Sequence, residues 1–225
     1  MDFLSLNILV LIASVLGTVT GFGTSTIMLP VVMMFCPLSE ALLFVTIIHW
    51  FNALARTLAF KSGFDKRLIL YFGVSGILAA FFGAKTFSYL DKNILVLVIG
   101  SFLSAYSIFL WFSPDFKMRI TKTNEIISGL VSGYIAGIFG MGGTIRAAFL
   151  SAFKLPKNIY LANSALILLL IDSTRLITYF SQGMQITDDL NLDIFGHKYI
   201  GLTICIFLSL VSVQIGKFLV GKIPE

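Results

Sequence analysis

Residues 3–39 read FLSLNILVLIASVLGTVTGFGTSTIMLPVVMMFCPLS, without one charged side chain. As a single α-helix this stretch would be about 55 Å long, whereas the hydrocarbon core of a bilayer is about 30 Å thick. The helix must therefore break. Gly21 and Gly23 mark the place, because glycine tolerates the non-helical backbone that a break requires. We predict a helix over 3–20 and a shorter segment over 24–36 that enters the membrane partway, packed against protein.

The composition of the whole chain agrees with this interpretation. Hydrophobic residues make up 57% and charged residues 12% of the 225 positions, against roughly a quarter charged in an average soluble domain. A water-soluble surface cannot be built from so few charges. Further uncharged runs cover 68–84, 93–114, 126–145 and 199–216. Runs of this kind are typical of membrane spans, so we predict an all-α, multi-pass transmembrane bundle.

The second half of the chain repeats the first. Moving the sequence by 119 positions places Gly21 on Gly140, Gly23 on Gly142, Pro37 on Pro156 and Arg56 on Arg175. Four such coincidences at one shift are hard to ascribe to chance. Further along, the shift becomes 133 and places Gly83 on Gly216, because the loop 183–197 is longer than its counterpart in the first half.

We therefore predict two transmembrane repeats, residues 1–112 and 113–225. In the second repeat, the glycine-rich break is followed by a short segment over 144–153 and a helix over 158–181. The first repeat continues through another helix, 94–112, for which the second repeat would have no counterpart.

Loop charges predict how the repeats are oriented. The short loops 61–67 and 113–125 carry clustered lysine and arginine, which places both in the cytoplasm, whereas 183–197 carries neither and would lie outside. An odd number of crossings then separates 113–125 from 183–197. Tandem repeats that each cross the membrane an odd number of times are inverted relative to each other, as in many secondary transporters. This placement also explains the net charge of +5 better than nucleic-acid binding does.

The two glycine-rich breaks are the candidate binding site. At a broken helix, backbone N–H groups lose their partners and the positive end of the helix dipole attracts anions. Two inverted breaks would meet near the midplane and form one site. The candidate residues are Gly21, Gly23, Thr24, Ser25, Gly140, Gly142, Gly143 and Thr144. Close helix packing is the alternative, because Gly17-xxx-Gly21 and Gly133-xxx-Gly137 also fit the pattern of small interface residues.

Five ionisable side chains fall within the apolar runs: Arg56, Arg146, Arg175, Asp172 and His49. Each costs at least about 2.5 kcal/mol at the centre of a membrane helix, so each needs a reason. Arginine suits an oxyanion because its guanidinium stays charged and can donate two parallel hydrogen bonds. We predict that Arg56, Arg146 and Arg175 contribute to anion binding. Asp172 and His49 are candidates for coupling transport to another ion.

Each of these residues also has a purely structural interpretation. Arg56 could extend to the membrane interface near Lys61. Asp172 and Arg175, three positions apart, could neutralise each other on one helix face. His49 could be a hydrogen-bonded core histidine.

The glycine-rich segments resemble those of the TauE/SafE family of sulfite exporters, whose members carry two copies of such a motif followed by a proline. The match is carried by Gly17-Thr-Val-Thr-Gly-Phe-Gly-Thr-Ser-Thr-Ile-Met-Leu-Pro30 and Gly133-Tyr-Ile-Ala-Gly-Ile-Phe-Gly-Met-Gly-Gly-Thr144. The chain departs from the family pattern at Thr24-Ser25, where glycines are usual, and in lacking a second copy of the proline. The resemblance implies a prokaryotic inner-membrane transporter for sulfite, sulfonates or related organic anions.

We predict a secondary transporter of small anions, driven by its own gradient or by protons. An anion channel and a membrane protein without a transport role are the alternatives. No P-loop, HExxH or GxSxG motif occurs, so we expect neither ATP hydrolysis nor enzymatic activity. The expected partners are a small anionic substrate and the lipid bilayer, and the oligomeric state stays open. We expect no cofactor and no metal, because Cys36 and Cys205 match no metal-ligand spacing.

Overall fold

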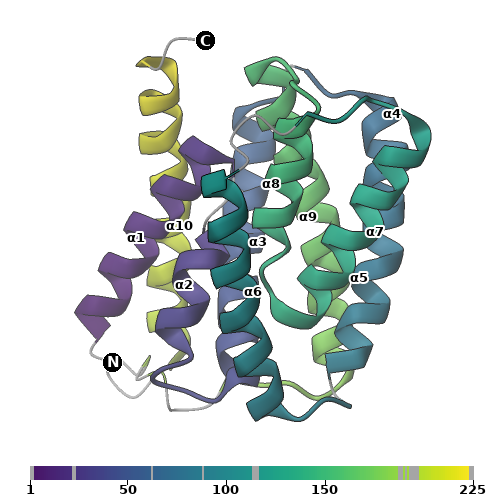
Figure 1. Ribbon diagram of the computed structural model, residues 1–225. Helices are drawn as coiled ribbons and strands as arrows, with labels where there is room; N and C mark the ends of the chain where they lie inside the picture. Colours follow the sequence, from purple (N-terminus) through teal and green to yellow (C-terminus); the bar gives the residue numbers. More distant parts are fainter. Residues whose placement is uncertain are drawn as a thin grey trace.

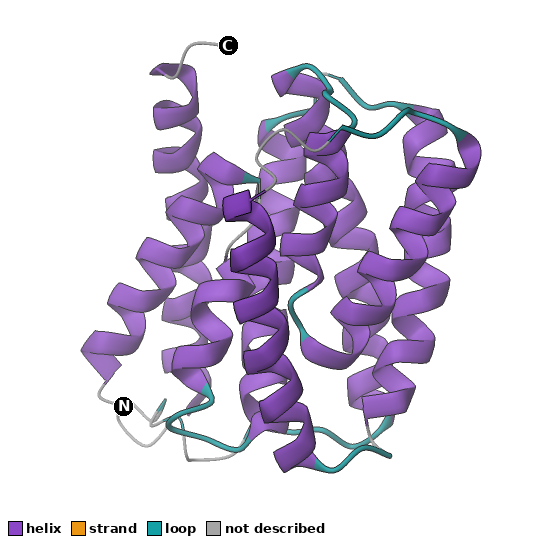
Figure 2. Ribbon diagram, viewed as in Figure 1, coloured by secondary structure: helices purple, strands orange, loops and turns teal. Residues whose placement is uncertain are grey.

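The computed structural model describes residues 3–21, 24–61, 63–87, 89–112, 117–186, 190, 192 and 198–222. Within them, every regular element is helical (Figures 1 and 2), as predicted. The elements are α1 (Phe3–Thr20), α2 (Thr24–Val32), α3 (Leu38–Ala59), α4 (Lys66–Leu68), the π-helical turn η1 (Ile69–Gly73), α5 (Val74–Phe87), α6 (Lys92–Phe112), α7 (Lys122–Phe139), α8 (Gly142–Ala152), α9 (Lys157–Ser181) and α10 (Lys198–Lys222).

Five helical stretches are long and apolar enough to cross a membrane. They are Phe3–Thr20, Leu38–Ala59, Lys66–Phe87, Lys157–Ser181 and Tyr199–Lys222. Their outward faces are lined with exposed large hydrophobic side chains, such as Leu4, Leu78 and Phe207. Exposed surfaces of this kind are stable in lipid and not in water, so the chain is a multi-pass membrane protein.

The first predicted break is present. α1 ends at Thr20, and Gly21 has a φ of +80°, a conformation that ends the helix and that side chains other than glycine disfavour. The second helix is shorter than the predicted 24–36, since α2 ends at Val32. Pro37, at the N-cap of α3, disfavours helical backbone in the residue before it, which prevents α2 from running on. With 9 residues, α2 is about 14 Å long and covers roughly half of the hydrocarbon core.

The second break follows the same design. α7 ends at Gly140, whose φ is +71° and whose N–H donates to the carbonyl of Ala136 at 2.9 Å. Its short helix, α8, has 11 residues and begins at Gly142, two residues before the predicted start at 144. α8 is therefore about 17 Å long, again too short to cross the membrane.

The helix bounds follow the shift found in the sequence. α1 and α7 both have 18 residues, and they begin 119 positions apart, at Phe3 and Lys122. α3 and α9 also begin 119 positions apart, and each is preceded by a proline N-cap with nearly the same backbone angles: φ −56° and ψ 144° at Pro37, φ −53° and ψ 144° at Pro156. The repeat is thus a repeat of elements as well as of residues.

Each half packs its outer helices against the other half. α1 of the first half packs against α10 of the second, and α7 of the second half packs against α5 of the first. Both crossings use a small residue: a Cβ added to Gly83 would lie 3.1 Å from the Cα of Gly137, and one added to Gly216 would lie 2.6 Å from the Cβ of Thr18. Gly83 corresponds to Gly216, and Thr18 to Gly137, by the shifts of the sequence. The two crossings are therefore equivalent.

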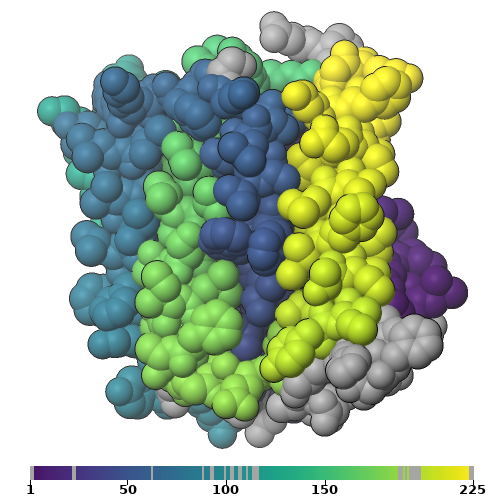
Figure 3. All heavy atoms as spheres, turned by 180° about the vertical axis from the view of Figure 1, so that it is seen from behind, coloured from purple at the N-terminus to yellow at the C-terminus, as the bar shows by residue number. Residues whose placement is uncertain are grey.

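α3 and α9 form the centre of the molecule and run in opposite directions. The loop that follows α3 contacts the start of α9, where Asp65 N–H donates to Oδ1 of Asn163 at 3.0 Å. Leu43, near the start of α3, instead packs against Tyr179 near the end of α9. Seen from behind, α3 is a dark blue strip between α9 and α10 (Figure 3).

The basic loops lie at one end of the bundle. Nε of Arg67 is 3.2 Å from Oε2 of Glu125, so α4, directly after the basic loop, meets the start of α7. Met118 N–H donates to the carbonyl of Ala152 at 2.9 Å, which places the end of α8 at the same end. We refer to it as the basic end.

Candidate functional site

The two short helices, α2 and α8, contact each other inside the bundle. A Cβ added to Gly143, in the first turn of α8, would lie 3.8 Å from Oγ of Ser25 and 3.7 Å from Nη2 of Arg146. The hydroxyls of Thr24, Ser25 and Thr26 are buried in the first turn of α2 and have no hydrogen-bond partner in the described ranges of the chain. Both helix starts therefore bring free polar groups to one place.

Arg56 lies in α3 and does not extend to the interface. Its side chain is 0% exposed, and none of its three guanidinium nitrogens has a hydrogen-bond partner among the described residues. Its electrostatic neighbours are Arg146, which repels it, and Tyr160. An isolated buried charge costs several kcal/mol, so an unpaired guanidinium is costly unless an anion binds to it.

Arg146 lies in α8, beside the second break. It is 1% exposed; Nε is 3.5 Å from Oγ of Ser164, and Nη2 has no hydrogen-bond partner. Ser164 in turn donates to the carbonyl of Gly21 at 3.0 Å. Tyr160, one turn earlier on α9, donates to the carbonyl of Thr20 at 3.0 Å. One face of α9 thus supports the first break and positions Arg146 next to it.

Arg175 differs from the other two arginines because it is paired. Its Nη1 donates to Oδ1 of Asp172 at 2.6 Å, and its Nη2 donates to Oγ1 of Thr46 at 2.8 Å. His49 approaches the other carboxylate oxygen, with Nδ1 2.9 Å from Oδ2 of Asp172. This last contact is an ion-pair distance whose angles fall outside hydrogen-bond geometry. The side chain of Tyr179 lies against Arg175, with its ring centroid 5.5 Å from Cζ.

The glycines of the second motif differ in how much space surrounds them. A Cβ on Gly142 would lie 2.6 Å from the carbonyl oxygen of Ser132, and one on Gly133 would lie 2.7 Å from the Cα of Gly76, so both serve close packing. Gly143 has room for a Cβ and faces Arg146. The packing interpretation therefore explains part of the motif and leaves the start of α8 for another role.

Two more predicted residues, Gly140 and Thr144, lie at the second break. Thr144 donates its hydroxyl to the carbonyl of Met141 at 2.8 Å, so its proton is used at the start of its own helix. A Cβ on Gly140 would lie 3.2 Å from Nη2 of Arg175. Gly23 lies outside the described residues.

Sequence reasoning missed Tyr160, Ser164 and Thr46. Tyr160 and Ser164 are polar residues four positions apart in α9, a spacing that puts them on one face. That signal was available in the sequence. No such signal pointed to Thr46, because the hydrogen bond that it accepts comes from Arg175, 129 positions away in the chain.

The charged groups of the site are shielded from both ends. Arg56, Arg146 and Arg175 are all at most 2% exposed. They carry three positive charges against the single carboxylate of Asp172. Such an excess of buried, partly unpaired guanidinium groups favours binding of a small anion rather than a cation.

The profile of the family described as Sulfite exporter TauE/SafE matches residues 6–225. The chain belongs to the TauE/SafE family. Searches of curated proteins and of solved structures found no match. TauE/SafE proteins are membrane transporters rather than enzymes, and the match over nearly the whole chain confirms the resemblance carried by the two glycine-rich motifs.

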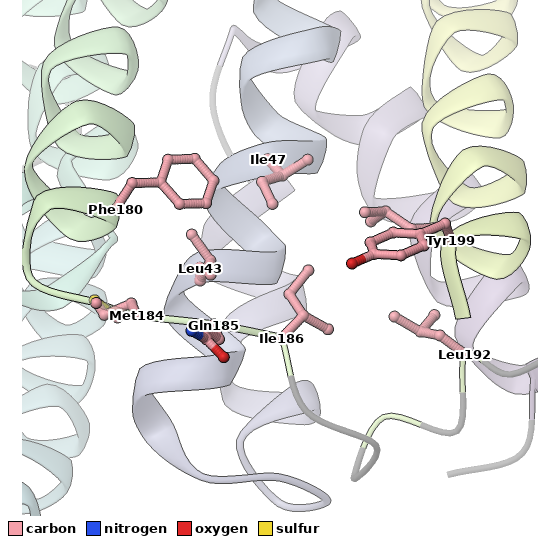
Figure 4. Close-up of a pocket in the computed structure, with 10 residues that line it drawn as sticks. Leu43, Ile47, Phe180, Met184, Gln185, Ile186, Leu192 and Tyr199 are labelled. Carbon is pink, nitrogen blue, oxygen red and sulfur yellow. The ribbon is translucent and has the colours of Figure 1, made fainter. Parts of the chain in front are cut away.

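This TauE/SafE chain also has a pocket of about 510 Å³ at the end opposite the basic end. Figure 4 shows Leu43 and Ile47 of α3, Phe180 of α9 and Tyr199 of α10 around it. Leu43 on the pocket wall also packs against Tyr179, whose hydroxyl lies 3.5 Å from Nη2 of Arg175. A thin apolar layer therefore lies between the pocket and the buried charges.

Proposed function

We propose that this protein is a secondary transporter of small oxyanions, such as sulfite, organosulfonates or related organic acids. The anion binds between α2, α3 and α8, held by Arg56 and Arg146. The observation that carries the proposal is the guanidinium of Arg56, which is fully buried and whose nitrogens have no hydrogen-bond partner within the part of the chain that the structure describes. A bound oxyanion supplies the missing acceptors, and the starts of α2 and α8 add hydroxyl and N–H donors.

A transporter fits this arrangement better than a channel. A channel needs a continuous wet path, whereas the arginines here are at most 2% exposed and an apolar layer of Leu43 and Tyr179 covers them towards the pocket. Equivalent helices α3 and α9 run antiparallel, which supports inverted repeats around one central site. In transporters of that design, rocking of one repeat against the other opens the site to each side in turn.

We propose the prokaryotic inner membrane as the location, with the basic end in the cytoplasm, in accordance with the positive-inside rule. The pocket at the other end is then the outer vestibule. It leads towards Arg175 through the layer formed by Leu43 and Tyr179.

The test is anion binding and transport by arginine variants. Purified protein is titrated with sulfite, sulfate, thiosulfate, methanesulfonate and small carboxylates, and uptake of the bound anions is measured in liposomes. Arg56→Gln and Arg146→Gln should each weaken binding at least about tenfold, because a hydrogen bond to a charged group contributes about 1.5–3 kcal/mol. Arg56→Lys should weaken binding less than Arg56→Gln does, since lysine keeps the positive charge but cannot donate two parallel hydrogen bonds from one planar group.

Arg119→Gln is the control, because it removes one positive charge from an exposed position at the basic end. It should bind and transport as the wild type does. Normal transport by folded Arg56→Gln and Arg146→Gln proteins would contradict the proposed site. A steady anion conductance across a planar bilayer, without saturable uptake, would favour the channel.

A further inference from the structure

The equivalent arginines of the two repeats have different surroundings. Arg175 is paired with Asp172, whereas Arg56 has no partner. Moving back by 119 positions from Asp172 leads to Ala53, so the first repeat has no carboxylate at that place. Moving forward by the same shift from His49 leads to Leu168. A titratable pair therefore accompanies only one of the two arginines, and anion binding by Arg56 and Arg146 does not use it.

The pair is enclosed within the protein. His49 is 2% exposed and Asp172 is 0% exposed, with Nδ1 and Oδ2 2.9 Å apart. Asp172 also accepts a hydrogen bond from Arg175, so a neutral imidazole leaves this cluster with no net charge. Uptake of one proton by the imidazole adds one positive charge to a closed space.

The charges that face His49 come from two helices. α9 contributes Asp172 and Arg175, and α8 contributes Arg146, which repels a charged imidazole. Of the other helices packed on α3, α1 and α2 carry no charged residue within their described bounds. α10 carries only lysines near its two ends, Lys198, Lys217 and Lys222.

We propose that His49 and Asp172 form a proton-binding site that is coupled to the anion site through Arg146. This inference rests on the proposed function, because the anion is the second ligand. Arg146 belongs to both sites: its guanidinium repels a proton on His49, and it lies beside Ser25 and Gly143 where the anion binds. An anion on Arg146 offsets that repulsion, so a proton binds more readily when the anion is present.

Linkage makes the effect reciprocal, so proton binding must tighten anion binding by the same factor. Two ligands that favour each other in one closed site cross the membrane together and in the same direction. Each cycle then carries one negative charge fewer than the anion alone.

The experiment measures proton uptake and anion affinity together. Sulfate and methanesulfonate are the probes, because both stay ionised between about pH 5.5 and about pH 8, where histidine titrates. Adding either probe to the wild-type protein in weak buffer should draw a proton from solution. The affinity should be at least about fivefold higher at about pH 5.5 than at about pH 8, within the usual range of coupling between two sites.

His49→Gln should bind the probes without proton uptake and with the same affinity at both pH values. Asp172→Asn should do the same, because a charged imidazole then loses its carboxylate partner, and this variant answers the question if His49→Gln does not fold. His197→Gln removes the other of the two histidines in the chain and should behave as the wild type.

Two results would overturn the coupling and leave anion binding intact. One is pH-dependent binding that persists in folded His49→Gln and Asp172→Asn proteins; the other is wild-type binding with no proton uptake, which would make His49 a neutral core residue. Folded wild-type protein that binds neither probe nor any other anion of the panel, at either pH, would overturn the proposed function and the coupling with it.

Discussion

Arg56 and Arg175 show what a sequence reveals about single residues in a membrane and what it does not. Their place in apolar runs made both conspicuous, and the repeat made them equivalent. Their different surroundings could not be predicted. Arg175 donates a hydrogen bond to Thr46, which lies on α3, whereas Arg56 has no hydrogen-bond partner among the described residues. Contacts between distant segments decide this, and no local pattern encodes them.

Gly143 gives a prediction at the same scale. Alanine fits there without a clash, yet its methyl group would lie between Arg146 and Ser25. We expect Gly143→Ala to keep the melting temperature of the wild type within a few degrees and to weaken sulfate or sulfite binding about fivefold, since the added group blocks close approach to the backbone N–H. Thermal unfolding and titration in detergent measure both quantities.

Gly142→Ala is the matched variant one residue away. Its Cβ would lie 2.6 Å from the carbonyl oxygen of Ser132, so it should lower the melting temperature, as overpacking by a methyl group commonly costs about 1–3 kcal/mol. Unchanged anion affinity in Gly143→Ala would mean that the anion does not approach this turn.

At the scale of elements, the sequence predicted the two broken helices because length and glycine content act locally. An uncharged stretch too long for one span must break, and glycine marks where. The ends of α2 were less predictable: the apolar pattern continues to Cys36, but the helix ends at Val32 before the proline that starts α3. Hydrophobicity shows which residues can lie in the membrane, and backbone sterics decide which of them are helical.

The crossing of α5 and α7 provides a test of how the elements pack. A Cβ on Gly137 would lie 2.6 Å from the backbone nitrogen of Ala84, so Gly137→Ala must separate the two helices. Threonine already occupies the equivalent position of the other crossing, Thr18, and Thr18→Ala adds no atoms there; it removes a hydroxyl that donates to the carbonyl of Ser14 within the same helix. We expect Gly137→Ala to unfold at a clearly lower temperature and Thr18→Ala to stay near the wild type. Equal melting temperatures for the two variants would contradict the packing described for α5 and α7.

For the whole molecule, the matching starts of helices 119 positions apart were predictable, but the packing of α1 on α10 and of α7 on α5 was not. The shift of 119 positions, read from residues such as Gly21 and Gly140, recurs in the starts of α7 and α9. A sequence shift states which elements correspond; it does not state which ones touch. Partner choice depends on the shapes of whole helix faces, such as the small residues where α5 meets α7.

The inverted arrangement of the two repeats can be checked by labelling. Cys36 and Cys205 are replaced by alanine, and single cysteines are placed in the loops 61–67 and 183–197. We expect a membrane-impermeant thiol reagent to label the second position from outside the cell and the first only in inside-out vesicles. Labelling of both positions from the same side would mean that the repeats are parallel.

The packing of α1 on α10 also bears on the order in which the protein is made. α1 leaves the ribosome before the other helices described here, and its partner α10 is the last of the described helices in chain order. Helices can enter the bilayer one at a time, since each satisfies its own backbone hydrogen bonds. The face of α1 that later meets α10 therefore stays without its partner until α10 has been made, and a chain cut short before α10 leaves that face permanently uncovered. Packing of these two helices has to wait for translation of α10.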